Sequence, residues 1–405
     1  MIIFQIAWRN VWRNTKRSVT VALAIAFGLW GGVVASGVFF GLTRDSVSGA
    51  VDTRLSHLQI HKKGFSDGRN FRDSVADTAP LMARLRSLPA VSAAAGRSVC
   101  EGMASSTITA QGVTIYGVDP DEERNATAIA EKVTLGSYFA GSVHNPVLVG
   151  EGLAETLQLR INSKVVLTMQ DSSGNLVAGA FRVEGMFRTV SASFDKSSVF
   201  VLRRDLAQLL GTPERIHEIA VRLRSPEQLD SVVSLVRSFT PGDTVESWRQ
   251  LAPELDYINE YTGVYLNAFL YIILTALLFG LMNTMLMSVL DRVREFGILQ
   301  AVGMRGRYMF AMIMMESVFL SLSGAVAGIA AGAATVAFFA HQGIDLTRFG
   351  EGLRTYGYTD LFFPAVPLWI YRQVAVSVIV TAVVASLYPA WRAIRLHPAQ
   401  AIRTY

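Results

Sequence analysis

Residues 18–43 read SVTVALAIAFGLWGGVVASGVFFGLT and contain no ionisable side chain. A helix needs about 20 apolar residues to cross the hydrocarbon core of a bilayer. Because lipid offers the backbone no hydrogen-bond partner, such a stretch must be helical. A cleaved signal peptide is the alternative, since basic residues precede the stretch, but a signal-peptide core has only about 7–15 apolar residues. The stretch therefore predicts a transmembrane helix.

Three further apolar segments are long enough to cross a bilayer. They are residues 261–290, 308–340 and 373–391, and Glu316 is their only charged residue. Hydrophobic residues make up 51% of the 405-residue chain, which is more than in an ordinary soluble protein. The sequence therefore predicts an α-helical membrane protein with four transmembrane helices, of which one precedes a long polar insertion and three follow it.

The basic residues beside these segments predict the orientation of the chain, because Lys and Arg are retained on the cytoplasmic side. They gather before the first segment, between the second and third, and after the fourth, and these places share one side of a four-span protein. Both termini are therefore expected in the cytoplasm. The predicted cytoplasmic parts are residues 1–17, 291–307 and 392–405, and the predicted outer parts are residues 44–260 and 341–372.

Residues 1–17 carry apolar side chains at helical spacing. The apolar face comprises Phe4, Ala7, Trp8, Val11 and Trp12. Trp is enriched at the depth of the lipid headgroups, so this pattern predicts a helix lying in the cytoplasmic interface of the membrane. A short cytosolic helix held by a protein partner is the alternative.

Residues 44–260 change to short alternating runs separated by Gly, Pro, Asp and Asn, which is typical of strands and turns. Strand-like runs include residues 106–116, 164–169 and 181–187, and helix-like runs such as residues 226–239 intervene. The pattern predicts a large mixed α/β domain with more than one lobe. After Pro253 an apolar stripe continues into the second span without a helix breaker, which predicts one helix joining this domain to the membrane.

The sequence lacks the motifs of common catalytic sites. It has no P-loop, no zinc-binding H-E-x-x-H and no G-x-S-x-G elbow. Cys100 is the only cysteine, which excludes an intramolecular disulfide and a cysteine-based metal site. His57 and His61 flank a strand-like run, which does not favour a metal site. We expect no catalytic residue, metal or cofactor on this chain, and its basic residues do not form a nucleic-acid-binding stretch.

Glu316 lies inside a predicted span. A charged side chain there is costly and marks a functional group by default. The alternative is a neutral or paired Glu that orders the helices, through Asn283 or a basic group at the cytoplasmic surface. Further along the same span, small residues from Ser323 to Ala333 recur at a spacing that lets another helix approach closely. Close packing is the first interpretation of this series, and a sliding interface is the second.

Residues 291–305, between the second and third spans, read DRVREFGILQAVGMR. Phe296, Leu299 and Val302 lie at helical spacing and Gly303 ends the run, so the stretch predicts a short amphipathic helix. An apolar helical edge exposed to the cytosol needs a partner groove. An interfacial helix held by lipid is the alternative.

This stretch resembles the signature R-E-[IF]-G-I-L-[RK]-A-[ILV]-G of MacB/FtsX-type ABC transporter permeases, although Gln300 stands where a basic residue is common. The likeness continues in Asn283-Thr284-Met285, in Glu316 and in the C-terminal run from Tyr388 to Arg403. The topology of one span, an outer domain and three spans is also that of the family. The segments that look most like the lipoprotein-releasing LolC/LolE branch are residues 7–10, 58–61, 147–154 and 181–187.

The resemblance implies a permease of the bacterial inner membrane with a MacB-like domain in the periplasm. It implies that residues 291–307 contain a coupling helix that docks on a separate cytoplasmic ATPase dimer, which would carry ATP and Mg. The movement of the coupling helix would pass through the membrane helices to the outer domain, a mechanism called mechanotransmission. This movement would extract lipoproteins from the outer leaflet. The implied ATPase-coupling residues are Arg294, Glu295, Phe296, Gly297, Ile298, Leu299, Gln300, Ala301, Val302, Gly303 and Met304.

Four helices enclose little on their own, so a second permease subunit, identical or homologous, is expected in the membrane lipid. A periplasmic chaperone or adaptor stays open as a further partner. Two other functions also stay open: export of drugs, peptides or toxins through a MacB-like pump, and FtsX-like regulation of a cell-wall hydrolase without transport. The large insertion disfavours the second, because that branch usually has a shorter outer domain.

Overall fold

The computed structural model describes residues 2–65, 73–141, 143–171, 173–345 and 361–395. The chain divides into two compact units. A helical unit contains residues 1–43, 260–344 and 361–405, and an inserted domain contains residues 44–259 with residues 345–360. Most of the predicted loop at residues 341–372, and the predicted tail beyond residue 395, lie outside the described residues.

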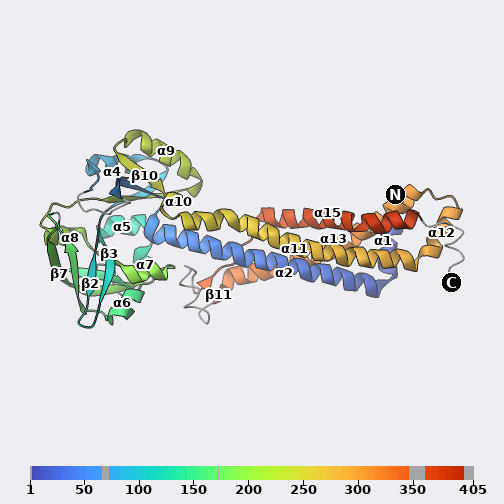
Figure 1. The fold of residues 1–405 in the computed structure, drawn as a ribbon, viewed down its shortest axis with the longest axis horizontal. Helices are drawn as coiled ribbons and strands as arrows, with labels where there is room; N and C mark the ends of the chain where they lie inside the picture. The colour runs from blue at the N-terminus through green and yellow to red at the C-terminus, as the bar shows by residue number, and fades with distance from the viewer. Residues whose placement is uncertain (1, 66–72, 142, 172, 346–360, 396–405) are drawn as a thin grey trace. The chain divides into compact units, whose positions relative to one another are not determined.

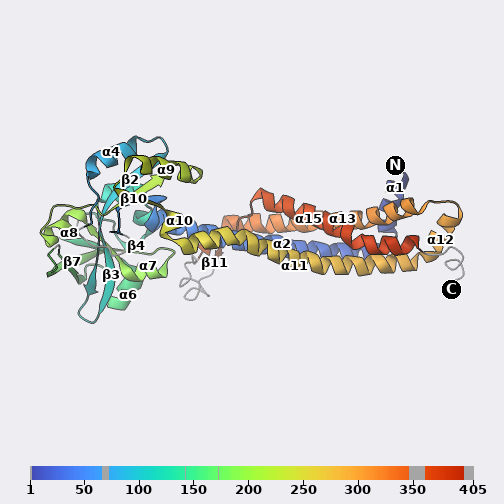
Figure 2. The ribbon, with the colours of Figure 1, turned by 45° about the horizontal axis from the view of Figure 1, so that its top comes forward.

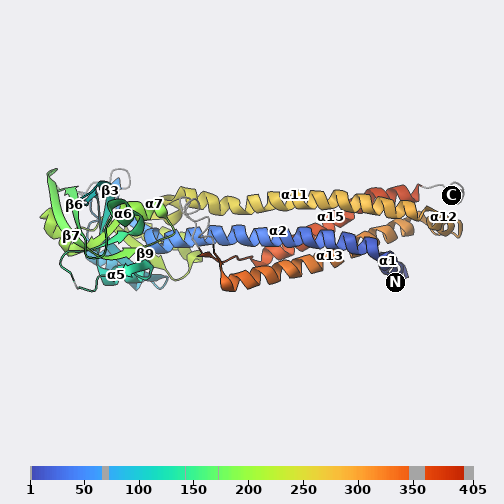
Figure 3. The ribbon, with the colours of Figure 1, turned by 90° about the horizontal axis from the view of Figure 1, so that it is seen from below.

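Among the described residues, six helices and a short two-stranded ladder lie wholly or partly in the helical unit. The helices are α1 (Ile2–Arg13), α2 (Thr15–Ala50), α11 (Pro253–Asp291), α12 (Val293–Ala301), α13 (Gly306–Gln342) and α15 (Leu368–Ile394), and the strands are β11 (Ile344–Asp345) and β12 (Leu361–Phe362). In the described part of the chain, the four helices long and apolar enough to cross a membrane are α2, α11, α13 and α15. They lie lengthwise beside one another (Figures 1 and 3). Helices α1 and α12 lie at the same end of this bundle (Figure 2).

Apolar side chains fill the middle of the bundle, where Leu29 of α2, Leu270 of α11 and Val374 of α15 belong to one buried cluster. Helix α13 approaches α2 along its small residues. A Cβ atom added at Gly324 would lie 2.6 Å from the carbonyl oxygen of Ala22, and one added at Gly328 would lie 2.5 Å from that of Ala26. Only glycine permits such an approach, so the small-residue series forms a closely packed seam, as its first interpretation predicts.

The inserted domain is a mixed sheet covered by short helices. Its helices are η1 (Val51–Leu55), α4 (Thr78–Ser87), α5 (Pro120–Ala126), η2 (Ile129–Lys132), α6 (Glu151–Leu157), α7 (Ala192–Ser197), α8 (Arg203–Leu210), η3 (Pro226–Gln228), α9 (Leu229–Phe239) and α10 (Trp248–Leu251). Its strands are β1 (Leu58–Lys62), β2 (Val91–Ser105), β3 (Ala110–Val118), β4 (Val133–Gly136), β5 (Pro146–Gly150), β6 (Lys164–Gln170), β7 (Leu176–Phe187), β8 (Ser198–Leu202), β9 (Glu218–Leu223) and β10 (Asp243–Ser247).

The strands described in this domain pair in the order β10-β1-β9-β2-β3-β8-β5-β7-β4, and β6 pairs with both β2 and β7. Among the described residues, the long strand β2 contributes to three buried clusters, one of which packs Phe194 of α7 against Phe187 of β7 and Phe200 of β8. A second packs α4 and α9 against β1, β9 and β10, and a third packs α6 and α8 against β5, β6, β7 and β8. All the strands described in this domain belong to one sheet, so the prediction of more than one lobe stays a prediction.

One predicted strand begins later than the sequence pattern indicates. Residues 106–109 form the turn of the β2–β3 hairpin, because the Ser106 hydroxyl accepts hydrogen bonds from the backbone N–H groups of Ile108 and Thr109 at 3.1 and 3.3 Å. A hydroxyl that bonds to neighbouring backbone groups competes with strand pairing. Strand β3 therefore begins at Ala110 rather than at Ser106.

The predicted fold class is confirmed. The structure has four candidate membrane helices, and a mixed α/β domain lies between the first of them and the rest.

Candidate functional site

Helix α12 is a separate short helix at the corner between α11 and α13. Arg292 breaks the helical backbone before it, with φ −117° and ψ 17°. Gly303 ends it with a positive φ of 97°, a conformation that favours glycine. The N–H of Met304 donates to the carbonyl of Leu299 and the N–H of Gly303 to that of Gln300, both at 3.0 Å. These two bonds form a Schellman cap, so the sequence determines where the helix stops.

The two faces of α12 have different surroundings. The Phe296 side chain is 1% exposed and packs with Met309 and Met312 of α13 and with Ala393 of α15, while Leu299 packs at the edge of this cluster. On the other face, Ile298 is 50% exposed and Val302 is 83% exposed. The predicted apolar edge of Phe296, Leu299 and Val302 is therefore wrong for its first two members. They hold the helix against the bundle, and the exposed apolar pair is Ile298 with Val302.

The other predicted coupling residues surround this pair. Gly297 of α12 is buried, whereas Gln300 and Met304 are half-buried. The exposed residues are Arg294, Glu295, Ala301 and Gly303. Residues 294, 298 and 302 follow one another at a spacing of four and share one side of the helix. This side presents a basic group followed by two aliphatic groups.

A chain of alternating charges links α12 to two other helices. Arg13 of α1 donates to both carboxylate oxygens of Glu295 at 2.8 and 3.1 Å. Nε of Arg292 donates to the same carboxylate at 2.9 Å, and its Nη1 lies 3.2 and 3.4 Å from the oxygens of Glu316 in α13. Burial alone would raise the pKa of Glu295, but the hydrogen bonds from Arg13 and Arg292 outweigh burial and lower it. Glu295 is therefore an anion at neutral pH.

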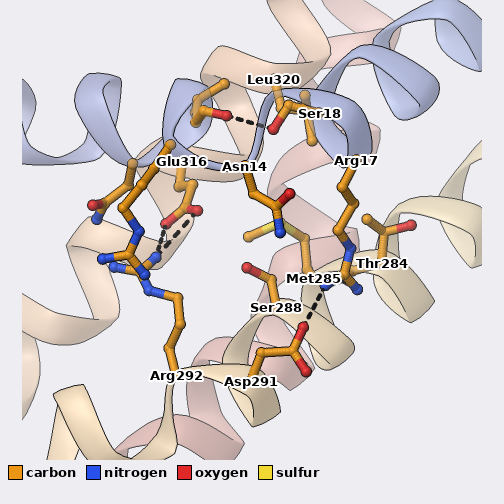
Figure 4. Close-up of a pocket in the computed structure, with 13 residues that line it drawn as sticks. Asn14, Arg17, Ser18, Thr284, Met285, Ser288, Asp291, Arg292, Glu316 and Leu320 are labelled. Atoms are coloured by element: carbon orange, nitrogen blue, oxygen red, sulfur yellow. Dashed lines mark hydrogen bonds and ion pairs between the residues drawn. The ribbon is translucent and has the colours of Figure 1, made fainter.

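Glu316 is buried and paired. Of the two partners considered from the sequence, Asn283 and a basic group, the structure selects the basic group, Arg292. Figure 4 shows the Arg292 side chain extending from the α11–α12 corner to this carboxylate. A second ion pair, Arg17 with Asp291 at 2.8 Å, joins α2 to α11 nearby.

These charged groups line a polar cavity of about 240 Å³ between α1, α2, α11 and α13. Asn10 also lines it, and its buried Nδ2 atom has no hydrogen-bond partner among the described residues. Helix α1 forms one wall of the cavity with Asn10, Val11 and Arg13, and its Phe4 and Trp8 rings contact Phe319 of α13. The sequence suggested a basic partner for Glu316 but did not identify Arg292, which was used there only to predict orientation. An isolated acid inside a span, with Arg at the adjoining corner, is the signal that would have paired them.

The inserted domain contains a second charged cluster. The Arg97 guanidinium donates to Glu123 at 2.9 and 2.6 Å and to Glu218 at 2.5 Å, and His61 lies 3.5 Å from both Glu218 and Glu246. Burial alone would lower the pKa of His61, but Glu218 and Glu246 outweigh it and raise the pKa to about 9. Burial would raise the pKa of Glu218, but the charge of Arg97 lowers it to about 2. Arg97 and His61 thus lie among buried carboxylates of the opposite charge.

The geometry of the described residues bears on metal binding. Among the residues that the structure describes, no three His, Cys, Asp or Glu side chains are grouped to hold a metal ion. Cys100 is buried, and burial raises its pKa to about 12, so its thiol is protonated and unreactive at neutral pH.

Two family models match the chain. The MacB-like periplasmic core domain matches residues 18–239, which is more than half of the chain, and the FtsX-like permease C-terminal domain matches residues 267–398. An uncharacterized ABC transporter permease of Methanocaldococcus jannaschii is 26% identical over 55% of this chain, and the match spans only about half of that relative. The lipoprotein-releasing system transmembrane protein LolC of Neisseria meningitidis is 24% identical over 72% of this chain and 73% of its own length.

Among solved structures, the periplasmic region of MacB from Actinobacillus actinomycetemcomitans covers 51% of this chain at 12% identity, with a TM-score of 0.36. A TM-score that low does not bear on function. The family models and the relatives agree on one assignment. The chain belongs to the MacB/FtsX-like family of ABC transporter permeases.

Proposed function

We propose that this chain is the permease subunit of an ATP-driven transporter of the inner membrane that works by mechanotransmission, with α12 docking on a cytoplasmic ATPase. The observation that carries the proposal is the division of α12 into two faces. Phe296 locks one face against α13 and α15, while Ile298 and Val302 remain exposed on the other. An exposed apolar pair on a firmly held helix suits a groove on a partner. Arg294 beside it would favour a groove with an acidic rim.

The orientation of the chain follows from the same proposal. The end of the bundle at α1 and α12 is rich in arginine, with Arg9, Arg13, Arg17, Arg292 and Arg305 in or beside these helices. An Arg-rich end is retained in the cytoplasm. The ATPase, with its ATP and Mg, would then meet α12 in the cytoplasm, and the inserted domain would be periplasmic.

Copurification tests the docking surface. In the variants Ile298→Glu and Val302→Glu, association with the ATPase should fall about tenfold or more, because a carboxylate buried without a partner costs well over 1.4 kcal/mol. Met103→Glu, at an exposed apolar residue of the inserted domain, is the matched control and should bind normally. If both α12 variants retain the ATPase at wild-type levels, the docking role of α12 is wrong.

We propose lipoproteins as the cargo, extracted from the outer leaflet of the inner membrane. The support is the similarity to LolC proteins of Neisseria meningitidis and Xylella fastidiosa, which extends over about 70% of this chain. Depletion of the chain should strand outer-membrane lipoproteins in the inner membrane, as measured by membrane fractionation. Normal lipoprotein sorting with increased drug sensitivity would instead indicate an exporter, and normal sorting with a cell-wall defect would indicate a hydrolase regulator.

A second permease subunit would complete the transporter. Large apolar side chains remain exposed on α2 and α11, including Phe27, Ile272 and Phe279. In a membrane these face lipid or another helix, and two such subunits would enclose what one cannot. The mass of the purified complex in nanodiscs should correspond to two permease subunits with two ATPases, and a complex containing one permease would contradict this.

A further inference from the structure

We propose that Glu316 is a positioning residue for α12, and that its ion pair with Arg292 ties the movement of α12 to that of α13. The transmission of movement through this ion pair rests on the docking role proposed above for α12. The anchoring of α12 does not rest on it, because both residues of the pair belong to this chain. In this proposal Glu316 holds α12 in place and does not relay a proton.

The burial of the pair is the first observation. The side chains of Arg292 and Glu316 are only 13% and 10% exposed, whereas those of Arg13 and Glu295 are about half exposed. A buried carboxylate that loses its cation leaves an uncompensated charge, so the two groups hold each other firmly. The cation is also a permanent one, because a guanidinium is not deprotonated in proteins. Such a partner suits an anchor.

The position of Arg292 is the second observation. It lies at the corner where α11 ends and α12 begins, and it is shared between Glu316 of α13 and Glu295 of α12. Its guanidinium also lies 5.3 Å from the centre of the Phe296 ring, the residue that seats α12. One side chain therefore connects the carboxylate of α13 to the charged and apolar anchors of α12.

The packing of α13 extends the connection to a third helix. At Gly324 and Gly328 the backbone of α13 lies so close to that of α2 that no Cβ fits between them. Two helices in such contact move together, because packed interfaces do not deform continuously. Helix α2 in turn continues without interruption to Ala50. A displacement of α12 would thus pass through Arg292 and Glu316 to α13 and then to α2.

The anchoring is tested in the isolated full chain. In nanodiscs, with Cys100→Ser as background, a nitroxide on Val302→Cys reports the mobility of α12. Glu316→Gln and Arg292→Gln should each produce a mobile spectral component, and the double variant should be no more mobile than either single variant. The swapped pair Glu316→Arg with Arg292→Glu should recover much of the immobile spectrum. Asp291→Asn, which removes the α2–α11 ion pair, is the matched control and should resemble the background.

The transmission is tested in the complex with the ATPase. ATP with vanadate should change the spectrum of a nitroxide on Ser48→Cys, an exposed position of α2. Glu316→Gln should reduce that change about fivefold or more while the ATPase remains bound. An unchanged Val302 spectrum in Glu316→Gln, or an equal effect of Asp291→Asn, would overturn the anchoring. If the wild-type chain binds no ATPase, the docking proposal fails, whereas the experiment on the isolated chain still decides whether Glu316 positions α12.

Discussion

The two units of the molecule each bury an arginine between carboxylates, but the two clusters differ in what surrounds them. Arg97 in the inserted domain is 1% exposed, and its partners Glu123 and Glu218 are also buried. Arg292 in the helical unit has one buried partner, Glu316, and one exposed partner, Glu295. The first cluster is closed, so loss of its arginine leaves buried carboxylates without a counter-charge. The cluster of Arg292 is open and extends from the buried Glu316 to the exposed Glu295 on α12, so binding of a partner at α12 can affect Glu316.

Removal of Arg97 should have the largest effect on stability. In Arg97→Gln the carboxylates of Glu123 and Glu218 stay buried without their cation, which costs about 3–5 kcal/mol. Hydrogen exchange of the full chain should show a corresponding loss of protection in β2 and β9. Arg86→Gln is the matched control, because Arg86 pairs with Glu122 but is about half exposed, and its loss should cost about 1 kcal/mol or less. Equal protection in the two variants would mean that the closed cluster does not hold the domain.

The closed cluster should also make the inserted domain sensitive to pH. The pKa of His61 is raised from 6.5 to about 9, so its stabilisation is complete below pH 6.5 and is lost as the pH rises through 9. The loss should reach about 3 kcal/mol, measured by hydrogen exchange of β1 and β9 with correction for the intrinsic rate. Glu218, with its pKa lowered to about 2, acts in the opposite direction, and its contribution is lost only as the pH falls from 4.5 through 2.

The variant His61→Gln separates these two contributions. It should remove the loss of stability between pH 6.5 and 9, because Gln does not titrate. A decline of the same size in this variant would assign the pH dependence to other groups.

A substitution at the end of α12, beside the open cluster, should destabilise the chain less than the loss of Arg97 does. Gly303→Ala forces an alanine to a φ of 97°, which costs about 1–3 kcal/mol, whereas Gly303→Asn should cost less because Asn tolerates positive φ. Exchange of the α12 amides with solvent should rise accordingly. Gly280→Ala in α11 is the control, since a Cβ there meets nothing within 4 Å and φ is ordinary. Identical behaviour of the two alanine variants would show that the cap does not fix the helix.

The smallest effect is expected at the exposed end of the open cluster. Arg13→Ala removes a pair whose side chains are about half exposed, so it should change the stability of the chain by only about 0–1 kcal/mol. What remains of the effect should vanish at high salt, because exposed pairs are screened. A loss as large as that in Arg97→Gln would contradict the distinction between the two clusters.

The sequence predicted the features that depend on local pattern. The apolar runs specify the four long helices, and Gly303 specifies the end of α12. Long-range contacts escaped prediction. Strand β2 reads VSAAAGRSVCEGMAS, which has few strand-favouring residues, yet it pairs with β3, β6 and β9 and forms the centre of the domain. Tertiary pairing overrides propensity there.

The same reason explains the errors at the candidate site. Helical spacing placed Phe296 and Val302 on one stripe, but spacing alone cannot tell which part of a stripe meets the bundle. That is decided by Met309, Met312 and Ala393, which lie far along the chain. The partners of Arg97, Glu123 and Glu218, are likewise distant in sequence, and no local pattern indicates them.

Photo-crosslinking from α12 tests the central claim most directly. A photoreactive residue at Val302 should form an adduct with a polypeptide that carries an ATPase P-loop, identified by mass spectrometry of the crosslinked complex. The same probe at the buried Phe296 should form none. Crosslinks from Val302 only to lipid, in membranes where the ATPase is present, would show that α12 lies in the membrane interface and does not couple this permease to ATP hydrolysis.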